Sequence, residues 1–168
     1  SVSARIARPC LTSIKARGAR KVDHSFSARM GARKDAMNMR PTEILSAEHR
    51  VIEQVLDCLE KIAEQASARQ SIDLPSAEKA LRFLKAFADQ CHHGKEEGLL
   101  FPKIGERGIP ARVGPVAVMR DEHEEGRARI RGMTDALAAA CGNDPLAIMR
   151  FCEHAQGYVE LLREHIAK

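Results

Sequence analysis

The sequence predicts an all-α protein, in which an antiparallel four-helix bundle with a hydrophobic core follows a basic N-terminal segment. Hydrophobic residues make up 44% of the 168 residues, yet only five Phe, one Tyr and no Trp are among them. Such a core favours helices, because β-sheets draw heavily on aromatic and β-branched side chains. From Thr42 onward, apolar residues recur at steps of three and four, and breaks rich in glycine and proline divide this stretch into four segments.

The basic residues are concentrated at the N-terminus. Residues 1–40 hold ten Lys or Arg and two Asp, which leaves 17 basic and 21 acidic residues in 41–168. The sequence therefore predicts a basic, disordered segment over 1–40, which includes His24, and a folded domain over 41–168. The segment is interpreted foremost as an inert leader, with a transit peptide or an electrostatic arm as alternatives. The mildly acidic domain is not expected to bind nucleic acid.

Two helices are expected in the first half of the domain. The first runs from about Ser46, its N-terminal cap, to Ala66. The second begins near Pro75, because proline is tolerated in the first turn of a helix, and stops around Phe101–Pro102.

Two more helices are expected after a loop at Gly105–Pro115, whose glycines and prolines exclude a regular element. The third helix begins near Pro115 and ends before the break at Cys141–Pro145. The fourth helix is capped by Asn143 or Asp144 and runs to the C-terminus.

The cysteines and the hydropathy indicate a cellular compartment. The five cysteines are scattered and form no CxxC pair, which indicates free thiols in a reducing environment and neither disulfides nor a thiolate zinc site. No apolar run approaches the ~18 residues that cross a bilayer. We therefore expect a soluble, cytoplasmic protein without a membrane partner.

Each expected helix turns one histidine toward its apolar side when residues are placed 100° apart. These inward histidines are His49, His92, His123 and His165. By the same count His93 faces outward. Glu96 stands one turn after His92 and shares its face, so this pair presents a nitrogen and a carboxylate to a common point.

Such a cluster of polar side chains in an apolar core predicts a bound cation. Burying imidazoles and a carboxylate there costs several kcal/mol unless something compensates. Imidazole and carboxylate donors without thiolate suit iron, and less specifically manganese or zinc. A ferritin-like site is disfavoured, because no inward Glu stands three residues before His92, His123 or His165. Ordinary core histidines without a metal are the alternative.

Three further side chains are candidates for supporting roles around this centre. Tyr158, two turns before His165, either donates a hydrogen bond into the site or packs in the core. His154, on the same face three turns before His165, is interpreted as a core or supporting residue. Glu53, one turn after His49, adds a carboxylate or lies on a solvated edge.

Four motifs, in order along the chain, are similar to those of hemerythrin-like, or HHE cation-binding, domains. They are Glu48-His49-Arg50, the stretch HHGKEEGLLFP over residues 92–102, Glu122-His123-Glu124 and the segment REHIAK over residues 163–168. The resemblance covers residues 41–168 and implies a four-helix bundle with a non-haem di-iron centre. It implies that His49 and His123 are single-histidine ligands and that His92 and Glu96 form an HxxxE pair.

Two positions depart from the family pattern. His165 resembles the head of a second HxxxE pair whose acid would stand one position beyond Lys168, which leaves open whether one or two metals bind. Arg127 stands four residues after His123, where oxygen-carrying hemerythrins resemble HxxxH. One histidine fewer implies an iron with a more open or carboxylate-rich ligand sphere, which disfavours a pure oxygen carrier.

The resemblance implies a leading function and leaves alternatives. The first is a protein that binds, senses or turns over O₂ or peroxide, or nitric oxide, at an open iron position; whether it is an enzyme is left open. The second is a metal-stabilised sensory or interaction module without redox turnover. The third is a bundle that binds no metal.

Overall fold

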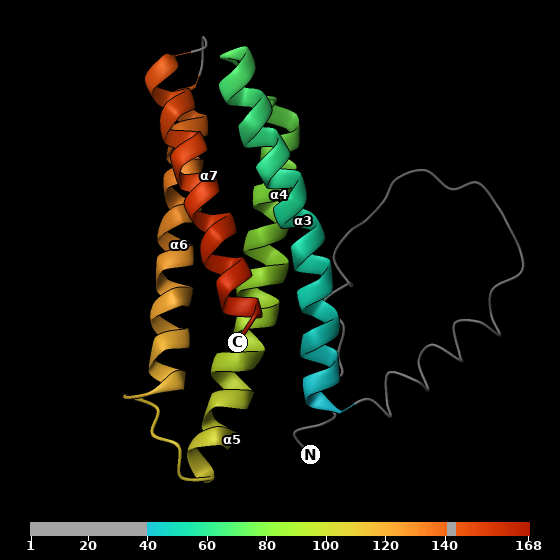
Figure 1. The fold of residues 1–168 in the computed structure, drawn as a ribbon, viewed down its shortest axis with the longest axis vertical. Coiled ribbons are helices and arrows are strands. Elements are labelled where there is room, and N and C mark those ends of the chain that lie inside the picture. Colours follow the sequence, from blue (N-terminus) through green and yellow to red (C-terminus); the bar gives the residue numbers. More distant parts are fainter. Residues whose placement is uncertain (1–39, 141–143) are drawn as a thin grey trace, which may run out of the picture. The chain divides into compact units, whose positions relative to one another are not determined.

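The computed structural model describes residues 40–140 and 144–168, and these residues form four helical rods and no strand (Figure 1). The predicted all-α class is therefore confirmed. The first, third and fourth rods are α3 (Pro41–Arg69), α6 (Pro115–Ala139) and α7 (Pro145–Ile166). The second rod is continuous and consists of α4 (Leu74–Phe83), η2 (Leu84–His93), η3 (Glu96–Leu100) and α5 (Phe101–Glu106). The predicted disorder of the basic segment falls on residues outside the described part.

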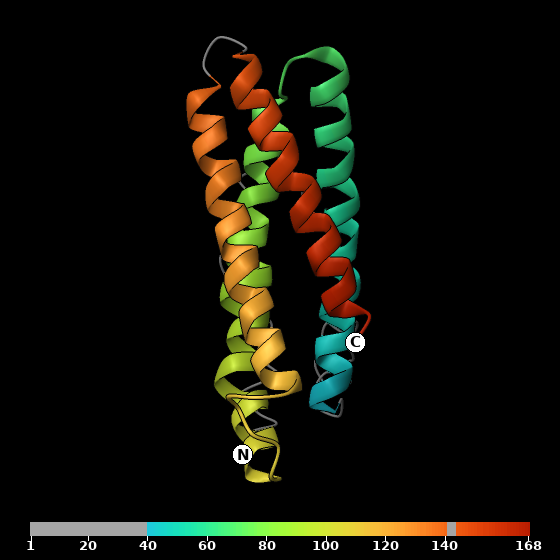
Figure 2. The same ribbon diagram turned by 60° about the vertical axis from the view of Figure 1, so that its left-hand side comes forward.

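The chain divides between Glu48 and His49, and the unit His49–Lys168 carries the histidines of the predicted site. Within this unit the four rods lie lengthwise beside one another and alternate in direction along the chain (Figures 1 and 2). Cys152 of α7 donates to the carbonyl of Ala63 of α3 at 3.3 Å, and α6 packs along α7. This unit is an antiparallel bundle.

The start of α3 differs from the prediction. Ser46 lies inside the helix and is exposed, and the helix begins at Pro41. Proline is favoured in the first turn, where its missing N–H needs no partner. Glu43 accepts a hydrogen bond from the backbone N–H of Arg40 at 2.8 Å, as the glutamate of a capping box does. The acidic side chain in the first turn therefore replaces the expected serine cap.

The end of α3 also lies later than the expected Ala66. The helix continues to Arg69, and Gln70 takes the left-handed conformation with a φ of 51°. The N–H of Ser71 then bonds the carbonyl of Ala66 at 3.2 Å. This is the hydrogen bond of a Schellman motif, which satisfies a carbonyl of the last turn.

The second rod does not stop at Phe101–Pro102 as predicted, but continues through α5 to Glu106. Its middle part, η2 and η3, is π-helical. In a π-helix each N–H bonds the carbonyl five residues back, so a turn holds more residues than in an α-helix. Pro102 lies in the first turn of α5, directly after this change of register, where its missing N–H is tolerated.

Two aspartates cap helices in the described part. Asp73 accepts hydrogen bonds from the backbone N–H and the hydroxyl of Ser76, at 3.3 Å and 2.7 Å. Asp144 accepts from the N–H of Leu146 at 3.1 Å, which confirms one of the two predicted caps, whereas Asn143 lies outside the described residues.

The core of the unit is aliphatic with a few aromatic rings, as the composition predicts. Fully buried side chains from the four rods include Ile52, Leu56, Leu59, Leu84, Met133, Phe151 and Tyr158. None of the helices that the structure describes combines the length and the apolar character needed to cross a membrane.

Candidate metal centre

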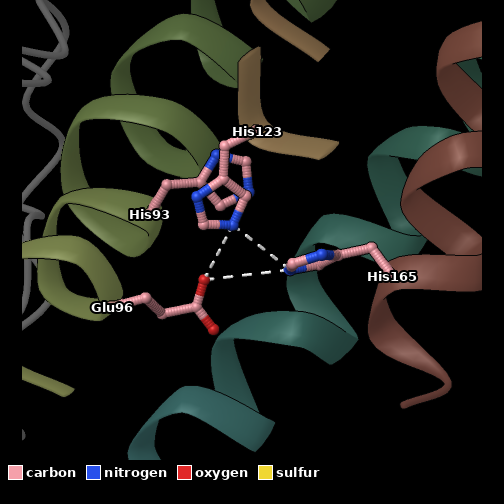
Figure 3. Close-up of side chains that lie close together, drawn as sticks. All are labelled: His93, Glu96, His123 and His165. Atoms are coloured by element: carbon pink, nitrogen blue, oxygen red, sulfur yellow. Dashed lines mark hydrogen bonds and ion pairs between the residues drawn. The ribbon is translucent and has the colours of Figure 1, made fainter. Parts of the chain in front are cut away.

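Six side chains from all four rods meet at one level of the unit His49–Lys168. They are His49 from α3, His92 and His93 from η2, Glu96 from η3, His123 from α6 and His165 from α7. Their donor atoms form two groups, and within each group all donors lie within 4.8 Å of one another. We call His93, Glu96, His123 and His165 the inner position, because all four are buried (Figure 3). We call His49, His92 and Glu96 the outer position, because His49 is only half-buried.

Glu96 belongs to both positions, with one carboxylate oxygen facing each. Its Oε2 lies 3.2 Å from Nε2 of His123 and 3.8 Å from Nε2 of His165 (Figure 3). Its Oε1 lies 3.6 Å from Nε2 of His92 and 4.0 Å from Nε2 of His49. A carboxylate placed in this way has the arrangement of a bridge between two cations.

The donor chemistry of the cluster fits a metal. Among the described residues, Nδ1 and Nε2 of His93 and Oε2 of Glu96 are buried without a hydrogen-bond partner. The Nε2 atoms of His123 and His165 face one another at 3.4 Å. Leaving buried polar atoms unsatisfied costs about 1–3 kcal/mol each, and a cation among them removes this penalty. Nitrogen and oxygen donors without a thiolate suit iron, manganese or zinc.

The prediction that His93 faces outward is wrong. Its side chain is buried, at 2% exposure, and the centroid of its ring lies 3.9 Å from the centroid of the His123 ring. The prediction placed residues 100° apart, but His92 and His93 end the π-helical η2. Because each turn there holds more residues, two successive histidines both reach the centre of the bundle. The only signal in the sequence is the doublet His92-His93 itself, and helical periodicity does not interpret it.

Two glutamates that the sequence reasoning did not assign hold the outer nitrogens of the imidazoles. Nδ1 of His123 lies 2.7 Å from Oε1 of Glu97, and Nδ1 of His165 lies 2.9 Å from Oε2 of Glu122. Glu122 also receives the ammonium of Lys168. When Nδ1 donates to a carboxylate, Nε2 keeps its lone pair toward the cluster, which is the usual arrangement around metal-bound histidine.

Arg127 lies behind the inner position and not among its donors. Its Nε, Nη2 and Nη1 donate to Asp89, Glu97 and Glu124 at 2.7, 2.7 and 2.6 Å. The Oδ1 of Asp89 lies 3.8 Å from Nδ1 of His93. Residue 127 of α6 provides no imidazole, and the inner position has the imidazole of His93 from η2 among its donors.

The electrostatics of the cluster keep His93 neutral and Glu96 charged, the forms in which each can bind a cation. Burial lowers the pKa of His93 to about 4, so its ring is neutral near pH 7. Burial alone would raise the pKa of Glu96, but the rings of His123 and His165 outweigh burial and hold it well below its usual value. Burial likewise opposes the charged form of His165, yet its two carboxylate partners raise its pKa.

The three predicted supporting residues belong to neither donor group. Tyr158 is buried, and its hydroxyl has no hydrogen-bond partner among the described residues. The ring of His154 covers Gly132 of α6, and Glu53 is exposed. The structure therefore brings together all five predicted ligands and adds His93, whereas metal binding by these six residues stays a prediction.

Comparison with known proteins agrees with this architecture. The model of the hemerythrin HHE cation-binding domain matches residues 40–168, and the chain belongs to this family. An uncharacterised protein of Mycobacterium bovis and uncharacterised proteins of two Mycobacterium tuberculosis strains are each 23% identical over 126 residues. The match covers 75% of this chain and 49% of theirs, so the chain spans about half the length of these relatives. No solved structure gives a significant match.

Proposed function

We propose that the protein binds two metal ions, iron foremost, at the inner and outer positions, and that it binds, senses or turns over O₂ or peroxide there. The observation that supports this proposal most directly is the placement of Glu96. Each of its two oxygens faces a separate group of imidazoles, an arrangement in which one carboxylate can bind two cations. Membership of a cation-binding family supports metal binding.

The two positions differ in how many donors the chain provides. The inner position has three imidazoles and one carboxylate oxygen, and the outer position has two imidazoles and one carboxylate oxygen. A pair of ferrous ions at such positions supplies electrons and open coordination sites for O₂, peroxide or nitric oxide. His49 and His92 leave more of the outer position open, so we expect the small ligand to approach from that side.

A cavity of about 490 Å³ adjoins the cluster on the side of His49 and His165. Its remaining lining is largely apolar and consists of Pro115, Val118, Met119, Ile166 and Lys168. An apolar lining holds little ordered water and admits a small uncharged molecule without a desolvation penalty. This chemistry favours O₂, nitric oxide or neutral hydrogen peroxide over a charged substrate.

Metal analysis followed by ligand exposure tests the proposal. Protein loaded anaerobically with ferrous iron and freed of excess metal is expected to retain about two irons per chain. Exposure to O₂ or peroxide is then expected to produce ferric absorption bands that change when azide is added. Two bound irons without any response would favour a metal-stabilised sensory or interaction module. Failure to retain iron would reject the proposal.

The cytoplasmic location stays a prediction.

A further inference from the structure

Arg127 connects two side chains of the inner position through carboxylates. Its guanidinium donates to Glu97, whose same Oε1 lies 2.7 Å from Nδ1 of His123. It also donates to Asp89, whose Oδ1 faces Nδ1 of His93 at 3.8 Å. These two imidazoles, of His123 and His93, are stacked on one another. One planar cation thus lies behind both rings.

The placement of this network distinguishes it from an ordinary surface ion pair. The side chains of Arg127, Asp89 and Glu97 are 23%, 25% and 27% exposed, so they are shielded from much of the solvent. Exposed ion pairs contribute little to stability and have no required geometry. Here two short hydrogen bonds, both of 2.7 Å, determine where the carboxylates of Asp89 and Glu97 stand.

We propose that Arg127 is a positioning residue of the inner metal position, which orients His123 through Glu97; this inference rests on the proposed metal binding. The guanidinium holds the Glu97 carboxylate in place through a hydrogen bond of 2.7 Å. A fixed carboxylate holds the proton of His123 on Nδ1 and leaves Nε2 free for a cation.

A substitution at Arg127 therefore acts on the metal without removing any donor. With Arg127→Gln, Glu97 and Asp89 lose their shared partner, and His123 loses the fixed carboxylate that orients its ring. Losing a residue that orients a metal ligand weakens metal binding by about 10- to 100-fold. Arg127→Lys keeps the charge but presents no planar fork to three carboxylates, so we expect an intermediate loss.

Arg129 provides a matched control on the same helix. It donates to Glu125 at 3.0 Å and is 30% exposed, but its hydrogen bond leads to no imidazole. Arg129→Gln removes an ion pair of a comparably exposed arginine and is expected to change metal affinity less than twofold. Thermal unfolding of each metal-free variant measures the purely structural effect separately.

Cobalt(II) binding to the purified chain, followed by proton NMR, tests the proposal. The Nδ1 protons of cobalt-bound His123 and His165 give shifted, exchangeable signals, which Glu97→Ala and Glu122→Ala assign by removing one signal each. In Arg127→Gln and Arg127→Lys the His123 signal is expected to broaden through exchange with water, while the His165 signal, whose partner is Glu122, persists. The affinity of one of the two cobalt ions falls in parallel.

The outcomes separate this inference from the proposed function. If the wild-type chain binds no cobalt and no iron, the proposed function itself fails. If it binds two cobalt ions and both Arg127 variants keep the wild-type affinity and a sharp His123 signal, Arg127 has no positioning role. An equal loss of affinity in Arg129→Gln would also overturn the inference, because the effect would then be a general one on helix α6.

Discussion

The rings of His93 and His123 lie face to face, with 3.9 Å between their centroids and 14° between their planes. Nδ1 of His123 has a carboxylate partner, whereas neither nitrogen of His93 has a hydrogen-bond partner among the described residues. Such a buried imidazole either binds a cation or leaves its polar atoms unsatisfied, and the two cases differ in metal stoichiometry.

Replacing His93 by alanine is expected to remove metal from the inner position and leave the outer one. The stoichiometry measured by metal analysis should fall from about two ions per chain to about one. His154→Ala is the matched control, since His154 is a histidine of the bundle that belongs to neither donor group. Two ions bound with wild-type affinity in His93→Ala would return His93 to a purely structural role.

Helical periodicity predicted the rods and four of the five inward histidines. Three of these four lie on regular α-helices, and the fourth, His92, still faces inward in the π-helical η2. It did not predict His93, since the π-helical stretch η2 is not marked by any glycine, proline or charge pattern that the period of an α-helix resolves. The hydrogen bonds of a π-helix, from each N–H to the carbonyl five residues back, depend on how the rod packs against its neighbours. Tertiary packing, and not local sequence, decides that register.

The supporting carboxylates were missed for a related reason. Glu97 and Glu122 flank predicted ligands in the sequence, but their role depends on which imidazole of another helix they reach. Glu97 extends from η3 to His123 of α6, and Glu122 extends from α6 to His165 of α7. These contacts join residues that lie 26 and 43 positions apart in the sequence and on different helices, so the spacing along either helix does not encode them.

Replacing Glu96 by glutamine is expected to weaken both metal positions, because its two oxygens serve one position each. The substitution keeps the shape of the side chain and removes its charge. Metal titration should show both ions bound at least about tenfold more weakly. Glu53→Gln is the control: this exposed glutamate of α3 belongs to neither donor group. Loss at only one position would contradict the sharing of Glu96.

Replacing Gly132 by alanine is expected to destabilise the bundle. A Cβ at Gly132 would clash with Nε2 of His154, so that ring must move. Overpacking of this kind costs about 1–3 kcal/mol, measurable by urea unfolding. Gly105→Ala, in α5 with no atom within 4 Å of the added Cβ, should instead be neutral or stabilise by about 0.5–1 kcal/mol. Equal effects of the two substitutions would be inconsistent with the close contact of His154.

Acidification is expected to destabilise the metal-free protein through His93. Its pKa is about 4 in the folded chain against 6.5 for an unperturbed histidine, so between these values the unfolded chain takes up a proton that the folded chain does not. The free energy of unfolding therefore falls, by at most about 1.4 kcal/mol per pH unit, as the pH drops from 6.5 to 4.

His165 acts in the opposite direction, and its pH dependence lies above pH 6.5. Its carboxylate partners raise its pKa despite burial, so it stabilises the folded chain below pH 6.5, and this stability is lost as the pH rises through the folded value. His93→Gln removes only the first effect. Urea unfolding from pH 7 to 5 should therefore show a smaller loss on acidification in the variant, and parallel curves for both proteins would refute the assignment.

Replacing Tyr158 by phenylalanine tests whether this side chain supports the metal centre. Its hydroxyl is buried without a hydrogen-bond partner among the described residues, and burial raises its pKa, so it carries no charge at neutral pH. Removing an unsatisfied hydroxyl while keeping the ring is expected to leave the free energy of unfolding of the metal-free protein unchanged or to raise it by up to about 1–2 kcal/mol. The ring itself packs beside Gly126, one turn after His123, and stays in the variant. A loss of stability confined to the metal-bound form, together with a changed iron absorption spectrum, would instead show that the hydroxyl donates a hydrogen bond to the metal centre or to a ligand bound there.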